Sequence, residues 1–384
     1  MTIRICGDEW MEYIMLKDVC DINMGQSPDS SSYNDDGDGL PFFQGNADFG
    51  ERYPVTRKWC SVPTKIAKPE DILISVRAPI GALNYAREKC CIGRGLAALT
   101  PDKSKVSPEF IFWLLKAKNI ELNNKGTGST FKAIGRNVLE DTQVPNVPLT
   151  VQLEYSQVLE RIYTIIQSRK KQLQKLDDLV KARFVELFGD GNHPRIALID
   201  LIIEGAGLSY GIVQPGDDGT GDMGILRPVD MVDGKISTAS IKYIDRSIGD
   251  GFKKTELCGD ELLITVRGTT GITALTDIRF NGMNVTRGIA VVRYDRNKIN
   301  PVYLNAYLNT DESQRYIQEH TRGATLQQIN LSDLRVQQIM VPPLALQEQM
   351  AAFVTQADKS KAVIQKALDE VQLLFDSLMQ KYFG

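Results

Sequence analysis

The most regular pattern in the chain is a pair of long stretches with helical periodicity. From residue 151 to 188 there is no Gly or Pro, and apolar or bulky side chains recur at alternating steps of four and three. This spacing is typical of the seam of a coiled-coil helix. The predicted seam positions are Ile162, Ile166, Arg169, Leu173, Leu176, Val180, Arg183 and Leu187 in the first stretch, and Ala357, Lys361, Ile364, Leu368, Val371, Phe375, Leu378 and Tyr382 in the second.

The segments that precede these two stretches have a different pattern. They consist of short β-branched runs separated by Gly, Pro, Asn and Asp. Residues 71–76 and 261–266 are continuous apolar runs of strand length, which predicts two buried strands. Residues 110–116 and 302–308 each follow a proline, which predicts two short helices. Each of these segments is therefore expected to be a mixed α/β or β-rich globule.

The two halves of the chain repeat each other in order. The repeated blocks are 71–81 with 261–271, 94–99 with 287–292, and 128–134 with 323–329. The step between copies is 190 residues at the first block (71 to 261), 193 at the second (94 to 287) and 195 from the third onward (128 to 323). One such match could be a common strand or helix pattern, but a run of ordered matches indicates a duplicated structural unit.

The repeat predicts an α+β protein in four parts. Two globules, at 1–149 and 191–343, are separated by two long coiled-coil helices at 150–190 and 344–384. A helix of about 37 residues extends roughly 55 Å, which is more than one globule needs, so we expect the two helices to pair. Packing of each helix on its own globule is the alternative.

An antiparallel pair of helices would relate the two halves by an approximate two-fold axis. The globules would then lie at opposite ends of a rod, as in a dimer that binds two separated DNA half-sites. The helix length would limit their separation to roughly one to one and a half turns of DNA.

Bulk composition narrows the possible functions. The net charge of −3 argues by itself against nucleic acid, although an acidic surface can coexist with one basic cleft. No apolar stretch is long enough for a membrane span, and the N-terminus lacks a signal-peptide core, so we expect a cytoplasmic protein that does not enter a membrane. The six cysteines and two histidines show no zinc-ligand spacing, which predicts free, mostly buried thiols and no metal site.

Sequence signatures of catalysis are missing. The chain has no Asn-Pro-Pro-Tyr-type methyltransferase motif, no G-x-x-x-x-G-K-[ST] loop and no nuclease carboxylate cluster. A calcium loop beginning at Asn34 is not supported, because its twelfth position is Gly45 instead of a glutamate. We therefore expect a chain that is not an enzyme and that holds no cofactor of its own.

Several motifs carry a family resemblance. They are Met-Gly-Gln-Ser-Pro at 24–28 with 39–45, a variant opening at 210–216 with 224–230, and a Val-Pro-Pro-Leu segment leading into a Gln-rich helix start at 341–349. In the first copy of that segment, 147–154, one proline is displaced, which alters how the chain enters the helix. Over essentially its whole length the chain resembles the specificity subunit of type I restriction–modification enzymes.

This resemblance implies a function and a set of partners. Two target-recognition domains would each read one part of a split sequence in double-stranded DNA. The long helices would dock two modification (methyltransferase) subunits, and restriction subunits would join through them. S-adenosylmethionine, ATP and Mg²⁺ would belong to those partners. The globules of the two halves differ more than the helices do, which suits a bipartite, asymmetric target.

Loop residues with forked donor groups are the candidates for DNA contact, because Arg, Asn and Gln side chains can form bidentate hydrogen bonds with base edges. The candidates in the opening loops are Gln26, Gln44 and Asn46, with Tyr210, Gln214 and Arg227 as approximate counterparts. Arg77 and Arg267 end the repeated strands, and Arg94 and Arg287 precede a glycine in both halves. For these four arginines, a phosphate contact and a structural salt bridge both remain open.

The glycine-containing loop at 126–130, followed by Lys132 and Arg136, is a further candidate. Its backbone N–H groups and positive charge could bind a phosphate, or it could be a plain helix-capping turn. The counterpart loop contains Arg322 and Thr325, with Gln327 and Gln328 after it.

Two other functions remain open. The chain could be a coiled-coil scaffold whose globules bind protein without DNA specificity, or an enzyme that uses the 126–128 loop for a nucleotide.

Overall fold

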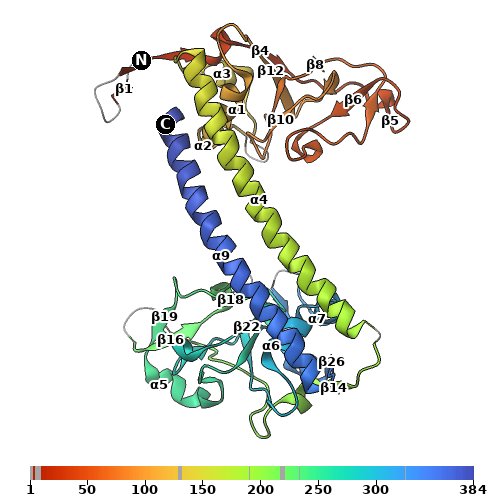
Figure 1. Cartoon of the computed structure of the whole chain (residues 1–384), viewed down its shortest axis with the longest axis vertical. Coiled ribbons are helices and arrows are strands. Elements are labelled where there is room, and N and C mark those ends of the chain that lie inside the picture. The colour runs from red at the N-terminus through yellow and green to blue at the C-terminus, as the bar shows by residue number, and fades with distance from the viewer. Residues whose placement is uncertain are drawn as a thin grey trace. The chain divides into compact units, whose positions relative to one another are not determined.

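The computed structural model describes residues 3–4, 10–128, 132–189, 191–216, 221–232, 234–324 and 326–384. The chain divides into two compact units, of which unit 1 comprises residues 1–170 and 366–384, and unit 2 comprises residues 171–365. The two long helices are confirmed as α4 (Leu149–Phe188) and α9 (Leu344–Phe383) (Figure 1). Each unit therefore holds one β-rich domain and a part of both long helices.

The two largest sheets of the β-rich domain of unit 1 have four and five strands. The strands of the four-stranded sheet, in spatial order, are β10 (Leu83–Tyr85), β9 (Ile72–Ser75), β12 (Leu96–Pro101) and β4 (Cys20–Met24). Those of the five-stranded sheet are β5 (Tyr33–Asn34), β7 (Trp59–Cys60), β6 (Leu40–Phe43), β11 (Cys90–Ile92) and β8 (Ile66–Ala67). Leu73 and Leu96 of the first sheet share one buried cluster with Phe43 and Ile92 of the second. The core of this domain therefore lies between the two sheets.

Unit 2 repeats this architecture in the same strand order. Its four-stranded sheet consists of β22 (Thr273–Leu275), β20 (Leu262–Thr265), β24 (Ile289–Val292) and β15 (Ser209–Tyr210). A smaller sheet consists of β19 (Lys242–Ile244), β16 (Met223–Leu226) and β23 (Asn284–Val285). The strand register repeats as well, because Leu73 pairs with Ala98 while their repeats Leu263 and Val291 pair with each other. The duplication detected in the sequence is thus a duplication of backbone pairing.

A short helix joins each domain to the long helices. These helices are α1 (Pro108–Ala117) and α6 (Pro301–Leu308), and both begin with the predicted proline behind a side-chain cap. In α1 all six residues from Phe110 to Leu115 are buried. Both long helices contribute to this burial, because the ring of Trp113 lies 5.4 Å from the ring of Tyr163 on α4 and 5.7 Å from that of Phe375 on α9. The helix is apolar all round because it is covered on several sides.

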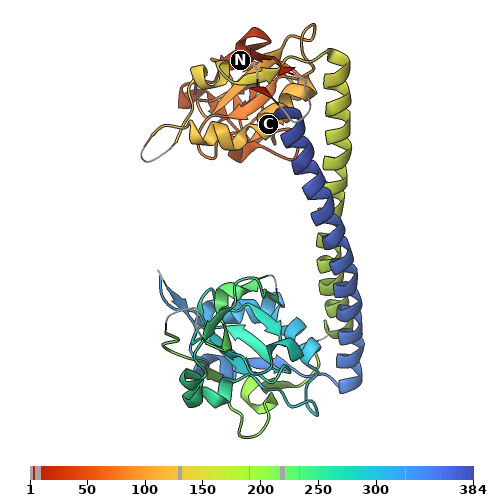
Figure 2. The same ribbon diagram turned by 90° about the vertical axis from the view of Figure 1, so that its left-hand side faces the viewer.

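The C-terminal end of α9 belongs to the core of unit 1. It lies beside the first β-rich domain in both views (Figures 1 and 2). The ring of Phe383 is 5.2 Å from that of Phe110, and Phe383 is only 1% exposed. In unit 2 the corresponding cluster contains Phe188 of α4, together with Tyr303 of α6.

A buried glutamine ties each long helix to its neighbouring domain. The side-chain oxygen of Gln152 accepts the N–H of Ser107 at 2.9 Å, and its amide donates to the carbonyl of Val147 at 2.8 Å. Gln347 repeats this in unit 2, accepting the N–H of Asn300 at 2.8 Å. Both glutamines thus hold the N-cap residue of a neighbouring helix from inside the core, where an unpaired amide would be costly.

Segments of α4 and α9 run antiparallel within each unit. In unit 1 the ring of Tyr155 stacks on Tyr382 at 3.8 Å, and Tyr163 lies 6.3 Å from Phe375. In unit 2 Lys361 forms an ion pair of 2.6 Å with Asp177. In that unit the guanidinium of Arg183 also lies 5.9 Å from the ring of Phe353. No helix among the described residues is long and apolar enough to cross a membrane.

Candidate nucleic-acid interface

Each unit brings five loop segments together at one end of its sheets. In unit 1 the N–H of Val76 donates to the carbonyl of Gly95 at 2.9 Å, and Ile134 donates to Val76 at 2.9 Å. In unit 2 Val266 donates to Gly288 at 2.8 Å, and Ile329 donates to Val266 at 3.0 Å. These bonds join the same repeated positions, so both loop clusters rest on one frame. We call residues 24–27, 43–46, 76–78, 92–95 and 132–134 the first edge, and residues 210–214, 226–229, 266–268, 285–288 and 327–330 the second edge.

Glycines allow the loops of each edge to approach so closely. A Cβ on Gly25 would lie 2.2 Å from the carbonyl oxygen of Gly93, and one on Gly95 would lie 2.4 Å from that of Gln44. On the second edge, a Cβ on Gly211 would lie 1.8 Å from the carbonyl oxygen of Val285. Any side chain there would collide with backbone, so the edges need glycine at these positions.

The first edge gathers the candidates that the sequence placed in the opening loops. The N–H of Gln26 donates to Ile92 at 3.1 Å, and the carbonyl of Gln44 accepts from Gly95 at 3.1 Å. The N–H of Arg94 lies 3.3 Å from the hydroxyl of Ser27. The side chains of Gln26, Gln44 and Arg94 are exposed, and Asn46 is half-buried. Three segments far apart in the chain thus present their polar side chains together.

Arg77 and Lys132 extend the first edge. Arg77 pairs with Ala133 in an antiparallel bridge, the N–H of Ala78 donates to the carbonyl of Lys132 at 3.0 Å, and both side chains are exposed. Arg136 differs, because its Nε lies 2.6 Å from the carboxylate of Glu140 on the same helical turn. Its charge is already compensated within α3 (Arg136–Glu140).

The second edge contains a cleft of about 290 Å³. Three predicted candidates, Tyr210, Arg267 and Arg287, line it. Gln328, which the sequence placed with the counterpart of the 126–130 loop, also lines it, as does Asn330, which was not among the candidates. The cleft therefore combines cationic, amide and aromatic groups, a combination suited to a nucleotide surface.

The other candidates of the second half have different surroundings. The guanidinium of Arg227 bonds the buried carboxylate of Asp230 at 2.9 and 3.0 Å and the carbonyl of Ser240 at 2.7 Å, so it braces its own loop. Gln214 and Gln327 are exposed. Arg322 lies 3.7 Å from Asp333. Thr325, like Ser129 and Thr130 of the first half, lies outside the described residues.

The repeated arginines of the two edges stand apart electrostatically. Arg77, Arg94, Arg267 and Arg287 form no ion pair with any residue that the structure describes. Arg94, Arg77 and Arg287 are exposed, and Arg267 is half-buried. Of the two possibilities left open by the sequence, the structural salt bridge is not seen for these side chains. Their charge is available to an anion.

Backbone register refines the alignment of the two edges. Met24 pairs with Ala97 as Tyr210 pairs with Ala290, so Tyr210 corresponds to Met24 and not to Gln26. Phe43 and Leu226 likewise occupy equivalent positions beside β11 and β23, which aligns Gln44 with Arg227. The counterparts that the sequence suggested for the first-edge candidates therefore differ from the structural alignment, by two residues in some cases and by a whole loop in another.

The loop at 126–128 offers less to a phosphate than its sequence suggested. The N–H of Gly126 donates to Asn123 at 3.2 Å, and that of Thr127 donates to Ala133 at 3.0 Å. These bonds close the end of α2 (Asn119–Asn124) and the base of a hairpin. Two of the N–H groups needed for a phosphate cradle are thus already used, which weakens the case for a nucleotide-binding enzyme.

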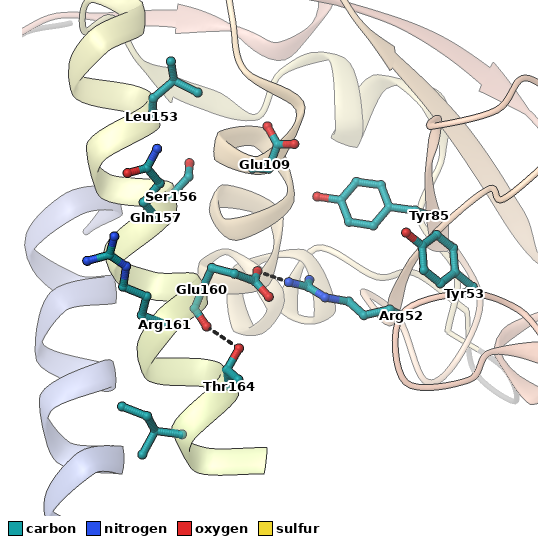
Figure 3. A pocket seen from close by; sticks show the side chains of 11 residues that line it. Arg52, Tyr53, Tyr85, Glu109, Leu153, Ser156, Gln157, Glu160, Arg161 and Thr164 are labelled. Atoms are coloured by element: carbon teal, nitrogen blue, oxygen red, sulfur yellow. Dashed lines mark hydrogen bonds and ion pairs between the residues drawn. The ribbon is translucent and has the colours of Figure 1, made fainter. Parts of the chain in front are cut away.

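A second surface in unit 1 lies between the domain and α4 (Figure 3). It is a cavity of about 970 Å³. Arg52 points from the domain to an ion pair with Glu160 of α4, while its second terminal nitrogen is buried without a hydrogen-bond partner. Tyr85 forms part of the wall, and burial holds the pKa of its phenol above the usual value. Leu153 of α4 also lines the cavity and is 46% exposed. The cavity thus presents apolar surface beside one buried guanidinium nitrogen that lacks a hydrogen-bond partner.

Comparison with known proteins identifies the class to which this fold and these edges belong. The family model described as type I restriction modification DNA specificity domain matches residues 8–177 and again residues 226–373. These two matches cover most of the chain, one in each half. The chain therefore belongs to the family of type I restriction–modification DNA specificity subunits.

Individual relatives agree with this assignment. The EcoBI specificity subunit of Escherichia coli is 22% identical over 98% of this chain and 86% of its own length. A Methanocaldococcus jannaschii protein named for the MjaX specificity subunit is 42% identical, but the match covers 42% of this chain and only 38% of that protein. The crystal structure of a type I S subunit from M. genitalium is 14% identical and matches with a TM-score of 0.59 over 100% of this chain and 98% of its own. That likeness shows a shared fold.

Proposed function

We propose that this chain is the DNA-sequence-reading subunit of a type I restriction–modification complex, with one edge for each half of a bipartite, asymmetric target. The observation that carries the proposal is the pair of edges itself. They rest on the same hydrogen-bonded frame, yet they present unlike side chains at equivalent positions, such as Met24 on the first edge and Tyr210 on the second. A shared frame with different side chains suits two half-sites of different sequence.

The long helices set the spacing between the two readers in this proposal. Within each unit the residue number on α9 falls as the number on α4 rises: Tyr155 and Tyr163 face Tyr382 and Phe375, and Asp177 faces Lys361. Antiparallel packing in each unit supports a continuous coiled-coil pair. Such a pair would hold the readers a fixed number of base pairs apart, on the order of one to one and a half DNA turns.

The same helices dock two modification subunits, and this chain contributes no catalysis. The cavity beside α4 supports the docking role, because Leu153 and Ile165 line it and are 46% and 45% exposed. S-adenosylmethionine, ATP and Mg²⁺ act in the partner subunits, and restriction subunits join through them. Purified alone, the chain should bind neither labelled S-adenosylmethionine nor labelled ATP.

The decisive test is the methylation pattern of the host genome. Long-read sequencing of cells with and without the gene should show one bipartite motif whose methylation disappears in the deletion strain and returns on complementation. The alternative is a coiled-coil scaffold that binds protein only, an idea favoured by apolar residues such as Val363 and Leu373, each 71% exposed on α9. An unchanged methylation pattern would support that scaffold and reject DNA reading.

A further inference from the structure

The two edges share some side chains and differ in others. Arg77 corresponds to Arg267, because each follows the equivalent valine, Val76 or Val266, whose N–H donates to a glycine carbonyl of the same unit. Arg94 corresponds to Arg287, one residue before the glycines to which those valines donate. At aligned positions nearby the side chains are unlike, as with Gln44 and Arg227.

Shared side chains cannot distinguish between two half-sites of different sequence. What unlike half-sites have in common is the phosphodiester backbone, which receives half or more of the hydrogen bonds in protein–DNA complexes. Resting on the proposed function, we infer that Arg77 with Arg94, and Arg267 with Arg287, form a phosphate clamp that is built once into each edge. The clamp binds the backbone of either half-site regardless of sequence, and the unlike side chains around it read the bases.

The geometry supports the pairing of these arginines. On the second edge both Arg267 and Arg287 line the same cleft of about 290 Å³. On the first edge the N–H of Val76 bonds the carbonyl of Gly95 at 2.9 Å, which places Arg77 and Arg94 on adjoining residues of neighbouring segments.

Charge balance separates these arginines from the others on the same surface. Within the described part of the chain none of the four has a carboxylate partner, whereas Arg227 beside them is neutralised by Asp230 at 2.9 Å. An uncompensated guanidinium pair binds a phosphate through charge-assisted, bidentate hydrogen bonds. Each such contact releases condensed counterions from DNA, so it leaves a measurable signature in the salt dependence of binding.

The experiment measures binding of the full chain, co-purified with its modification subunits, to two duplexes of equal length. One duplex carries the methylated motif and the other has both half-sites scrambled, and KCl is varied from about 50 to 200 mM. Arg267→Gln and Arg94→Gln should each weaken binding to both duplexes by the same factor. The magnitude of the slope of log K against log salt should decrease by about one. The fourfold rise in salt should therefore reduce the affinity of each variant by a factor that is roughly 3.5 times smaller than the factor for the unmodified chain.

Two further variants control for charge and folding. Arg279→Gln removes one exposed positive charge from the same unit. Arg279 follows the end of β22, where Leu275 pairs with Leu262 at the start of β20. Arg267 follows the other end of β20, so the two arginines lie at opposite ends of the sheet. It should leave both slopes unchanged. Arg267→Lys keeps the charge and should keep the slope, which separates loss of the contact from loss of the fold.

The alternative is a bidentate contact of these arginines with guanine. A variant that loses discrimination at one base position but keeps its affinity for scrambled DNA and its salt slope would overturn the clamp. If the unmodified chain binds DNA without preferring the motif, the proposed function fails, yet the slopes still decide the clamp. If it binds neither duplex, both ideas fail.

Discussion

Replacing Phe383 by alanine tests whether the last turn of the chain is part of the first unit. Phe383 is 1% exposed and packs against Phe110, a fully buried residue of α1. Truncation of a buried phenylalanine costs about 3–5 kcal/mol, through lost burial and the cavity left behind. A domain is stable by only about 5–15 kcal/mol in total, so the loss should be a large fraction for unit 1.

Hydrogen exchange followed by mass spectrometry can localise this loss. Amides such as those of β9 and β12 exchange through opening of unit 1. A decrease of about 3–5 kcal/mol in the free energy of opening should lower their protection factors by about two to three and a half orders of magnitude. The amides of β20 in unit 2 should keep their protection. Leu373→Ala is the matched control, because Leu373 lies on the same helix and is 71% exposed, and it should change stability by less than about 0.5 kcal/mol.

Two results would refute the reasoning. Unchanged protection in β9 would mean that the end of α9 does not complete the core of unit 1. An equal loss in β9 and β20 would mean that the two units open together, and the division of the chain into separate cores would be wrong.

Three other predictions use the same contacts. Gln347→Leu leaves the backbone N–H of Asn300, the N-cap residue of α6, without its acceptor, so urea unfolding should show a loss of about 1–3 kcal/mol. An unchanged midpoint would contradict the role of Gln347 in holding this residue. Iodoacetamide labelling of the native protein at pH 8 should modify the exposed Cys258 but not Cys20 or Cys90, because the thiolate is the reactive form and burial raises the pKa of both buried thiols to about 12. Early modification of either buried thiol would show that unit 1 opens readily. Leu368→Asp places a charge at a predicted seam position where the side chain is buried, and it should cost about 3–5 kcal/mol. Assembly with modification subunits in gel filtration should be reduced, and an unchanged complex would count against a helix pair.

Much of the fold could be predicted because its signals are local. The buried strands at β9 and β20 are continuous apolar runs, and the long helices lack Gly and Pro. The proline starts of α1 and α6 are visible in the same way. The repeat added long-range information, since each pairing found in one half implies the same pairing in the other. Domain limits at 1–149, 150–190, 191–343 and 344–384 stay predictions.

The composition of the edges was harder to predict because it depends on contacts between distant segments. Arg227 has the right chemistry for a base contact, yet Asp230, three residues later, occupies its guanidinium. Gln328 and Asn330 reach the cleft only because β25 (Gln327–Gln328) pairs with β21 (Arg267–Gly268). The individual DNA contacts therefore stay predictions, as do the seam residues.

The places where the two halves differ in length show which part of each domain is free to vary. The step between equivalent residues is 183 at the ends of β6 and β16 (43 to 226) and 190 at the starts of β9 and β20 (72 to 262). Seven extra residues of the second half therefore lie between these points, in the connection that leaves the edge at Gln44 or Arg227. From there to the C-terminus the step changes only from 190 to 195. A connection that begins at the edge can change length and side chains without disturbing the frame beneath it, so differences in DNA sequence preference between the two units should map mainly to residues 44–71 and 227–261.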